Sequence, residues 1–283
     1  MGFGNCSAPS APARVPSPHR ARLCAWGSLP RVTSARTIRL DLAYDGTSFR
    51  GWAAQRDPAV RTIEGALRGL LPRTLGEDVR LAVAGRTDAG VHATGQVVSF
   101  VTSSRRRPEQ VQAFVNGHLA PEVVVVSASV APEGFHARFW ATAREYRYVI
   151  DTARVSDPFR GRYEWHRASR LDLGAMRAAA RHLVGEHDFT SFCRHPGDGK
   201  ATVRRLERAT MSRDGERIVL RFRANAFLHQ MVRAMVGSLV RVGDGSLSPE
   251  DIARILAARD RTGAGNLAPA KGLTLEHVTY GRR

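Results

Sequence analysis

One short loop carries the residues of this chain whose types and spacing could do chemistry. Residues 84–93 read Ala-Gly-Arg-Thr-Asp-Ala-Gly-Val-His-Ala, so an arginine, an aspartate and a histidine fall within one polar segment. Apolar residues alternate with other residues on both sides of it, which predicts a strand before the loop and a strand after it. Gly85 and Gly90 let the backbone approach a ligand closely. A loop held between two strands can present the Asp88 carboxylate to a substrate, although Asp and Gly are also ordinary turn residues.

Further segments accompany this loop in a fixed order along the chain. They are Tyr44-Asp45-Gly46-Thr47 with Gly51-Trp52, Phe135-His136-Ala137-Arg138-Phe139 with Arg144-Glu145-Tyr146-Arg147-Tyr148, Gly185-Glu186-His187-Asp188-Phe189, Asn225-Ala226-Phe227 with Met231-Val232-Arg233, and Ala268-Pro269 with Gly272-Leu273. Together with the loop, they resemble the ordered motifs of the tRNA pseudouridine synthase A family, from about Thr37 to about Tyr280. Ala53 departs from the pattern because the family usually has Gln there, which puts one contact of that segment in question; Gln55 is kept.

The resemblance assigns the chemistry to three side chains. Asp88 matches the nucleophile, and Arg233 matches the cation that keeps a buried carboxylate ionised. Tyr146 matches the active-site tyrosine, which can stack on uracil and exchange a proton at C5. The implied activity is the isomerisation of uridine to pseudouridine at positions 38 to 40 of the tRNA anticodon arm. The family works as a homodimer in which one RNA touches both subunits.

Four more residues are candidates for contacts to the substrate, and two of them, Arg86 and Leu273, match family positions. Arg86 would help to move the target base out of its helix, and Leu273 would form an apolar wall of the pocket. Thr87 and His92 lie in the same loop as Asp88 and are further candidates for substrate contacts.

Without the resemblance, the same residue types fit simpler roles. Arg86 and Arg233 could each hold a backbone phosphate, because arginine is a common phosphate ligand. Tyr146 could be a half-buried residue of a sheet, and Leu273 could belong to the core.

The composition points to a polyanionic partner. The formal net charge is +17, and Lys200 and Lys271 are the only lysines, so 43 − 2 = 41 of the cationic residues are arginine. Arginine makes planar, bidentate contacts to phosphate and stacks on bases. We therefore expect nucleic acid as the partner. No apolar run approaches the roughly 18 residues that span a membrane, so we expect no membrane association.

We expect no cofactor and no metal ion. Converting uridine to pseudouridine moves neither electrons nor phosphate, so the chemistry needs a carboxylate, a water-poor pocket and a base lifted from its stack. Cys6, Cys24 and Cys193 are widely spaced, which argues against a disulfide framework or a zinc site and favours a reducing, cytoplasmic setting. The spacings of His92, His187 and His229 fit no ligand pattern.

The predicted elements indicate an α+β fold with two ferredoxin-like or RRM-like halves. The expected strands are 38–44, 79–83, 96–101, 122–129, 144–150, 203–211, 217–223 and 273–280, and the expected helices are 63–71, 108–119, 171–183, 227–242 and 249–258. The first half has the order β-α-β-β-α-β of a split βαβ unit, and the second half repeats a similar order. We expect an antiparallel sheet in each half and, as the resemblance implies, an active site in the cleft between them.

The expected domain boundaries follow composition and element order. Residues 1–36 hold five prolines, five arginines and no acidic residue, which is typical of a disordered basic tail. Residues 37–140 would form the half with the aspartate loop, and residues 141–283 the second half.

Two other functions remain open at this level. A non-catalytic RNA-binding protein with two RRM-like modules should show aromatic strings on its central strands, but 217–223 contains only Phe222. An N-glycoside hydrolase should show a second acidic residue for acid–base work, and the loop around Asp88 has none.

Overall fold

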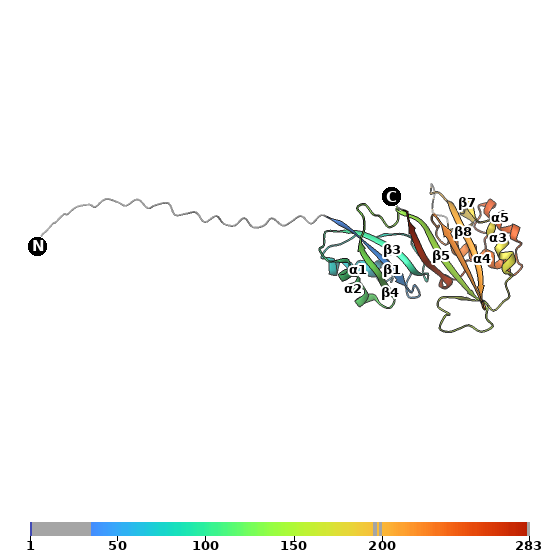
Figure 1. Ribbon diagram of the computed structural model, residues 1–283, viewed down its shortest axis with the longest axis horizontal. Helices are drawn as coiled ribbons and strands as arrows, with labels where there is room; N and C mark the ends of the chain where they lie inside the picture. Colours follow the sequence, from blue (N-terminus) through green and yellow to red (C-terminus); the bar gives the residue numbers. More distant parts are fainter. Residues whose placement is uncertain (2–34, 195–196, 198–199, 282–283) are drawn as a thin grey trace. The chain divides into compact units, whose positions relative to one another are not determined.

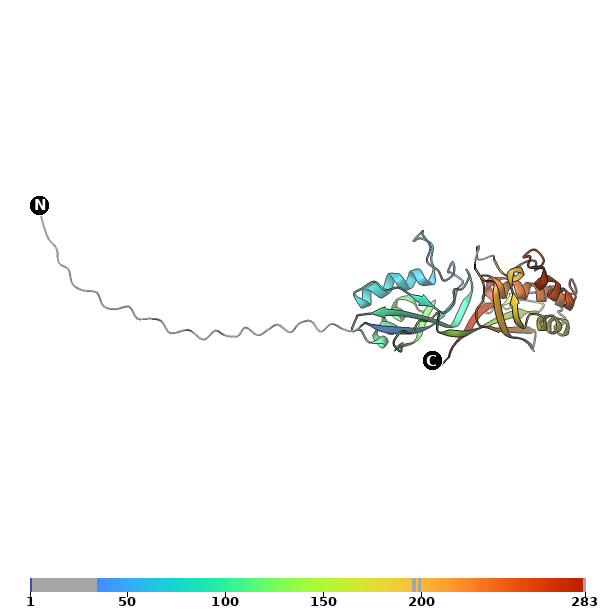
Figure 2. The same cartoon turned by 90° about the horizontal axis from the view of Figure 1, so that it is seen from above.

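The computed structural model describes residues 1, 35–194, 197 and 200–281 of the chain (Figures 1 and 2). The predicted basic tail over 1–36 lies outside these residues except for its first residue and its last two. Arg36 is already the first residue of a strand. The account that follows therefore concerns the folded unit that contains this strand and everything described after it.

Strands and helices alternate irregularly along the described residues. The strands are β1 (Arg36–Tyr44), β2 (Ala82–Val83), β3 (His92–Thr102), β4 (Val123–Val130), β5 (Ala141–Asp151), β6 (Trp165–His166), β7 (Gly185–Asp188), β8 (Val203–Asp214), β9 (Arg217–Ala224) and β10 (Leu273–Tyr280). The α-helices are α1 (Ile63–Leu75), α2 (Pro108–Leu119), α3 (Leu173–Arg181), α4 (Met231–Gly243) and α5 (Pro249–Ala258), with short 3-10 helices η1 (Thr190–Phe192) and η2 (Ala270–Gly272).

All the described strands belong to one mixed sheet in the order β4-β1-β3-β10-β5-β9-β8-β7, with β2 beside β3 and β6 beside β5. The expected α+β fold is confirmed, and the antiparallel sheets expected in the two halves are joined into this one sheet. The last strand, β10, inserts between the halves, pairing parallel with β3 and antiparallel with β5. Figure 1 shows α1 and α2 beside the first-half strands, and α3, α4 and α5 beside those of the second half. This continuity fixes the loops of the two halves relative to one another.

Most predicted elements are confirmed, with four informative differences. The strand expected over 79–83 shrinks to the two residues of β2, and β3 begins four residues early, at His92. The α4 helix begins at Met231 instead of Phe227, because Gln230 has φ 65° and lies outside the helical region. The strand expected over 203–211 continues three residues further, to Asp214, so the hairpin between β8 and β9 turns at Gly215 and Glu216.

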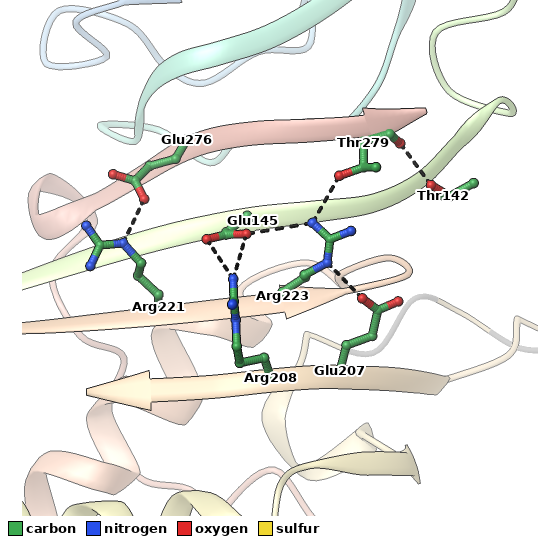
Figure 3. A network of polar contacts seen from close by, with 8 residues as sticks. All are labelled: Thr142, Glu145, Glu207, Arg208, Arg221, Arg223, Glu276 and Thr279. Atoms are coloured by element: carbon green, nitrogen blue, oxygen red, sulfur yellow. Dashed lines mark hydrogen bonds and ion pairs between the residues drawn. The ribbon is translucent and has the colours of Figure 1, made fainter. Parts of the chain in front are cut away.

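Alternation along the strands separates an apolar face from a charged face. On β9, Ile218, Leu220, Phe222 and Ala224 are buried, whereas the intervening residues are less so. Figure 3 shows the charged face, where the side chains link neighbouring strands: Arg208 to Glu145, Arg223 to Glu145 and Glu207, and Arg221 to Glu276. Because such half-exposed ion pairs contribute little each, the apolar face supplies most of the stability.

A substitution at Gly237 tests how the segment around Asn266 packs on α4. A Cβ at this position would lie 2.2 Å from the carbonyl oxygen of Asn266, so the backbone of the segment after α5 packs directly on the helix. We expect Gly237→Ala to lower the free energy of unfolding by about 1–3 kcal/mol, the usual cost of overpacking. Chemical denaturation measures the change.

The matched control is Gly69→Ala, at an exposed position of α1 where a Cβ meets nothing within 4 Å. This change should stabilise the protein by up to about 1 kcal/mol, because alanine is the better helix former. If both substitutions stabilised the protein, the packing of the Asn266 segment on α4 would be wrong.

Candidate active site

The aspartate loop runs from Ala84 to Val91, between β2 and β3, and the first half anchors it firmly. Gln96 on β3 donates from Nε2 to the carbonyl oxygen of Gly85 at 2.7 Å. The hydroxyl groups of Tyr44 and Thr87 share a hydrogen bond of 2.8 Å. The amide of Trp52 donates to the carbonyl oxygen of Thr87 at 3.0 Å. Three segments of the chain thus hold Gly85 and Thr87, the residues on either side of Arg86. Thr87 directly precedes Asp88.

The Asp88 carboxylate contacts two side chains from the segment around the start of α4, those of Arg233 and His229. Its Oδ2 accepts a hydrogen bond from Nη1 of Arg233 at 3.3 Å, and its Oδ1 lies 3.3 Å from Nε2 of His229. The Asp88 side chain is 17% exposed and that of Arg233 is 16% exposed, whereas His229 is 49% exposed. Asp88 is therefore a carboxylate held by a sheltered arginine, and it can be reached from one side.

A second set of bonds fixes Arg233 in this position. Its Nε donates to the carbonyl oxygen of Ala268 at 2.8 Å, while the Ala268 amide donates back to the Arg233 carbonyl at 3.1 Å. Arg233 lies in the first turn of α4, and the predicted apolar face of that helix, including Met235 and Leu239, is buried. Packing of this face therefore directs Arg233 toward the loop of the first half.

Tyr146 lies on β5 and is 6% exposed. Its ring packs edge-on against Phe227, with ring centroids 5.1 Å apart. A Cβ placed on Gly85 would lie 3.7 Å from the Tyr146 hydroxyl, so that hydroxyl borders the aspartate loop. Burial raises the pKa of Tyr146 well above its usual range, and the negative charge of Asp88 adds to the effect. Tyr146 is therefore a neutral phenol, able to donate a proton or to contact an uncharged base.

The other predicted site residues occupy different surroundings. Arg86 is exposed, and within the described part of the chain it has no ion pair. Leu273 is 5% exposed and starts β10, where it pairs with Tyr148. The side chain of Thr87 is turned to the Tyr44 hydroxyl. The structure thus brings Asp88, Arg233 and Tyr146 together, with Arg86 open to solvent.

His92 is engaged on both ring nitrogens. Its Nδ1 accepts a hydrogen bond from the amide of Gly46 at 3.1 Å, and its Nε2 lies 3.1 Å from the carbonyl oxygen of Arg162. Only a neutral ring with its proton on Nε2 fits both contacts. Asp45 Oδ1 also lies 3.2 Å from Nδ1, a contact that would favour the charged form. Burial outweighs it and lowers the pKa of His92, so the ring is neutral at neutral pH.

Residues that the sequence reasoning missed hold this site in place. Gln96, fully buried, and Tyr44 support the loop, and His229 faces Asp88. Gln96 shares the inward face of β3 with Val98 and Phe100, so a polar residue in an apolar alternation was a usable signal. No pattern in the sequence pointed to His229, which lies before the start of α4.

No third acidic, histidine or cysteine partner completes a metal site among the described residues. In the same residues, no helix is long and apolar enough to cross a membrane. Two surface hollows of about 300 and 440 Å³ lie elsewhere, one beside the β8–β9 turn and one beside the start of α1, and neither is lined by Asp88.

Comparison with known proteins identifies the family. The family model described as "tRNA pseudouridine synthase" matches residues 42–139 and 179–281, and both Asp88 and Arg233 fall within the matched segments. The chain belongs to this family. Proteins named tRNA pseudouridine synthase A are 43% identical in Brevibacillus brevis, over 87% of this chain and 100% of the relative, and 45% identical in Geobacillus kaustophilus, over 86% and 94%. A relative with the same name from Caulobacter vibrioides is 43% identical over 86% of this chain and 98% of its own length.

The neutral state of His92 predicts a pH dependence of stability. Because its pKa is lower in the folded than in the unfolded protein, the unfolded state binds more protons between the two pKa values. The free energy of unfolding should therefore fall as the pH drops below about 6.5, the ordinary histidine value. Urea denaturation from pH 7.5 to pH 5 measures this slope.

His92→Gln should weaken that slope, because glutamine does not titrate. His277→Gln, at an exposed position of β10, serves as the control and should keep the wild-type slope. Equal slopes in all three proteins would show that His92 is not held neutral.

Proposed function

We propose that this chain is a tRNA pseudouridine synthase that isomerises uridine at positions 38 to 40 of the anticodon arm, with Asp88 as the nucleophile. The observation that carries the proposal is the Asp88–Arg233 ion pair, which joins a loop of one half to a helix of the other. Family membership and the names of the relatives support tRNA as the substrate. The large positive charge fits a polyanion.

The geometry suits the required bond changes. Asp88 attacks C1′ of the target uridine, and the N1–C1′ bond breaks with its electron pair moving to uracil. The uracil turns and forms a bond from C5 to C1′, which releases Asp88. C5 then loses its proton and N1 gains one, so the reaction is a net isomerisation with no oxidant or reductant. Arg233 keeps Asp88 paired while both side chains are largely sheltered.

The remaining site residues bind the uridine and its surroundings in this proposal. Tyr146, as a neutral phenol beside the loop, stacks on the uracil or exchanges a proton with it. Arg86, exposed next to the loop, enters the RNA and helps to release the base. Leu273 forms an apolar wall. Thr87 and His92 are buried and hydrogen-bonded. They contribute to substrate binding by holding the aspartate loop in place.

We further propose that the enzyme acts as a homodimer in the cytoplasm, without a metal ion or other cofactor. The family resemblance supports the homodimer, and the scattered cysteines suit a reducing compartment. The division at about residue 140 into an aspartate-bearing half and a second half likewise remains a prediction.

Asp88→Asn tests the assigned chemistry. This substitution keeps the shape of the side chain and removes its charge and nucleophilicity. Pseudouridine formation should be lost, while the dissociation constant for tRNA should change little, because many arginine contacts to phosphate supply the affinity. Near-normal turnover, with deamidation to aspartate excluded by mass spectrometry, would rule out Asp88 as the nucleophile.

Arg233→Ala tests the pairing of the nucleophile. Removing the guanidinium leaves a sheltered carboxylate without its arginine, so turnover should also fall steeply. The double variant with Asp88→Ala should be little worse than Asp88→Ala alone, because residues that act as one unit are not additive. Fully additive losses would contradict the pairing.

A non-catalytic RNA-binding protein is the competing function. It predicts tRNA binding by the wild-type protein with no pseudouridine formed at any protein concentration. The Asp88–Arg233 pair favours the enzyme, since RNA binding alone gives no reason to shelter a carboxylate in a strongly basic protein.

A further inference from the structure

Arg144 is a buried arginine that the chemistry proposed above does not use. It lies on β5, two residues before Tyr146, and is 8% exposed. Burial lowers its pKa, yet an arginine remains charged in a protein. Within the described residues it forms no ion pair, so the charge is compensated by dipoles alone.

The Arg144 guanidinium donates hydrogen bonds to backbone carbonyl groups. Nε and Nη2 both donate to Ala84, at 3.1 and 2.8 Å. Nη1 donates to Asn225 at 2.7 Å and to Ala141 at 3.0 Å, and Nη2 also donates to Arg138 at 2.9 Å. These five bonds match the five donors of an arginine in its planar fork.

Two of these carbonyl groups lead directly into the active site. Ala84 is the first residue of the aspartate loop, four residues before Asp88. Asn225 follows β9 and begins the segment that leads to Arg233. One side chain therefore binds both chain segments whose side chains form the ion pair.

The other loop contacts cannot do this. Tyr44, Trp52 and Gln96 all lie in the first half, so they fix the loop only relative to its own strands. Arg144 comes from β5 and reaches from the second half. A buried charge is costly, and an apolar side chain would fill the same space at lower cost. A rigid fork of five donors is well suited to joining carbonyl groups from separate segments.

We propose that Arg144 is a positioning residue of the reaction, which sets the distance between Asp88 and Arg233 by binding the carbonyl groups of Ala84 and Asn225. This inference rests on the proposed function, in which Asp88 is the nucleophile. A misplacement of about 1 Å can cost about 100-fold in rate. Loss of the fork should therefore act on the rate and leave RNA affinity intact.

The test is a single-turnover measurement of pseudouridine formation with enzyme in excess over tRNA, at low temperature. Arg144→Lys keeps the charge but not the fork, and Arg144→Gln keeps a polar group without charge. The amplitude reports the folded fraction, and the rate constant reports the geometry of the folded enzyme. We expect rate constants reduced by about 100-fold in both variants, with tRNA dissociation constants within threefold of the wild-type value.

The matched control is Arg147→Lys, on the same strand. Arg147 pairs with Glu276 on the opposite face of β5, away from the loop. It should keep the wild-type rate constant. A rate constant within threefold of wild type for Arg144→Lys would overturn the proposal, and so would complete unfolding of both Arg144 variants, since Arg144 would then serve stability alone.

A second measurement separates positioning from a general structural role. Arg144→Lys should cost far less rate in an Arg233→Ala background, because the pair that it positions is already broken. An unchanged cost in that background would contradict the proposal. Asp88→Asn separates failure of the proposed function from failure of this inference. If Asp88→Asn retains turnover, the proposed function is wrong. If Asp88→Asn is inactive while Arg144→Lys has a normal rate constant, only the inference about Arg144 is wrong.

Discussion

The candidate active site depends on an ion pair between residues 145 positions apart, Asp88 and Arg233. A carboxylate in a sheltered site needs a cation, and here the cation comes from the first turn of α4, far from the loop in the sequence. The fold therefore has to hold the loop after β2 and the first turn of α4 at a fixed distance from one another.

The parallel pairing of β3 with β10 contributes most to holding these two segments together. By pairing with both β3 and β5, the last strand converts two split βαβ-like halves into one sheet. The parallel β3–β10 contact is short, with Thr274 opposite His92 and Leu275 opposite Ala93, directly after the aspartate loop. Gly95 allows β10 to approach, because a Cβ there would lie 2.1 Å from the Glu276 carbonyl oxygen. Arg144 and the Ala268–Arg233 bonds then refine the position.

Local sequence patterns predicted most of the elements, because alternation and helical spacing are local properties. The α5 helix was predicted to the residue from Ser248 at the N-cap and Pro249 after it. Ordered motifs selected Asp88, Tyr146 and Arg233, which the structure places together. The activities assigned to them remain predictions.

Features that depend on distant contacts were not predictable. A single continuous sheet requires knowing that β10 inserts between β3 and β5, which no local pattern contains. The late start of α4 depends on the left-handed conformation of Gln230, a residue type that does not mark such a position. The support of the loop by Arg144 depends on backbone carbonyl groups, and these leave no trace in side-chain patterning.

The most direct test of the account is to map pseudouridine in unmodified tRNA after incubation with the purified protein. We predict new pseudouridine at positions 38, 39 or 40 of the anticodon arm, formed without added cofactor. Metal effects have to be separated from tRNA folding by folding the tRNA before chelation. Pseudouridine at other positions only would contradict the assigned target, and tRNA that is bound but unmodified would contradict the enzymatic function itself.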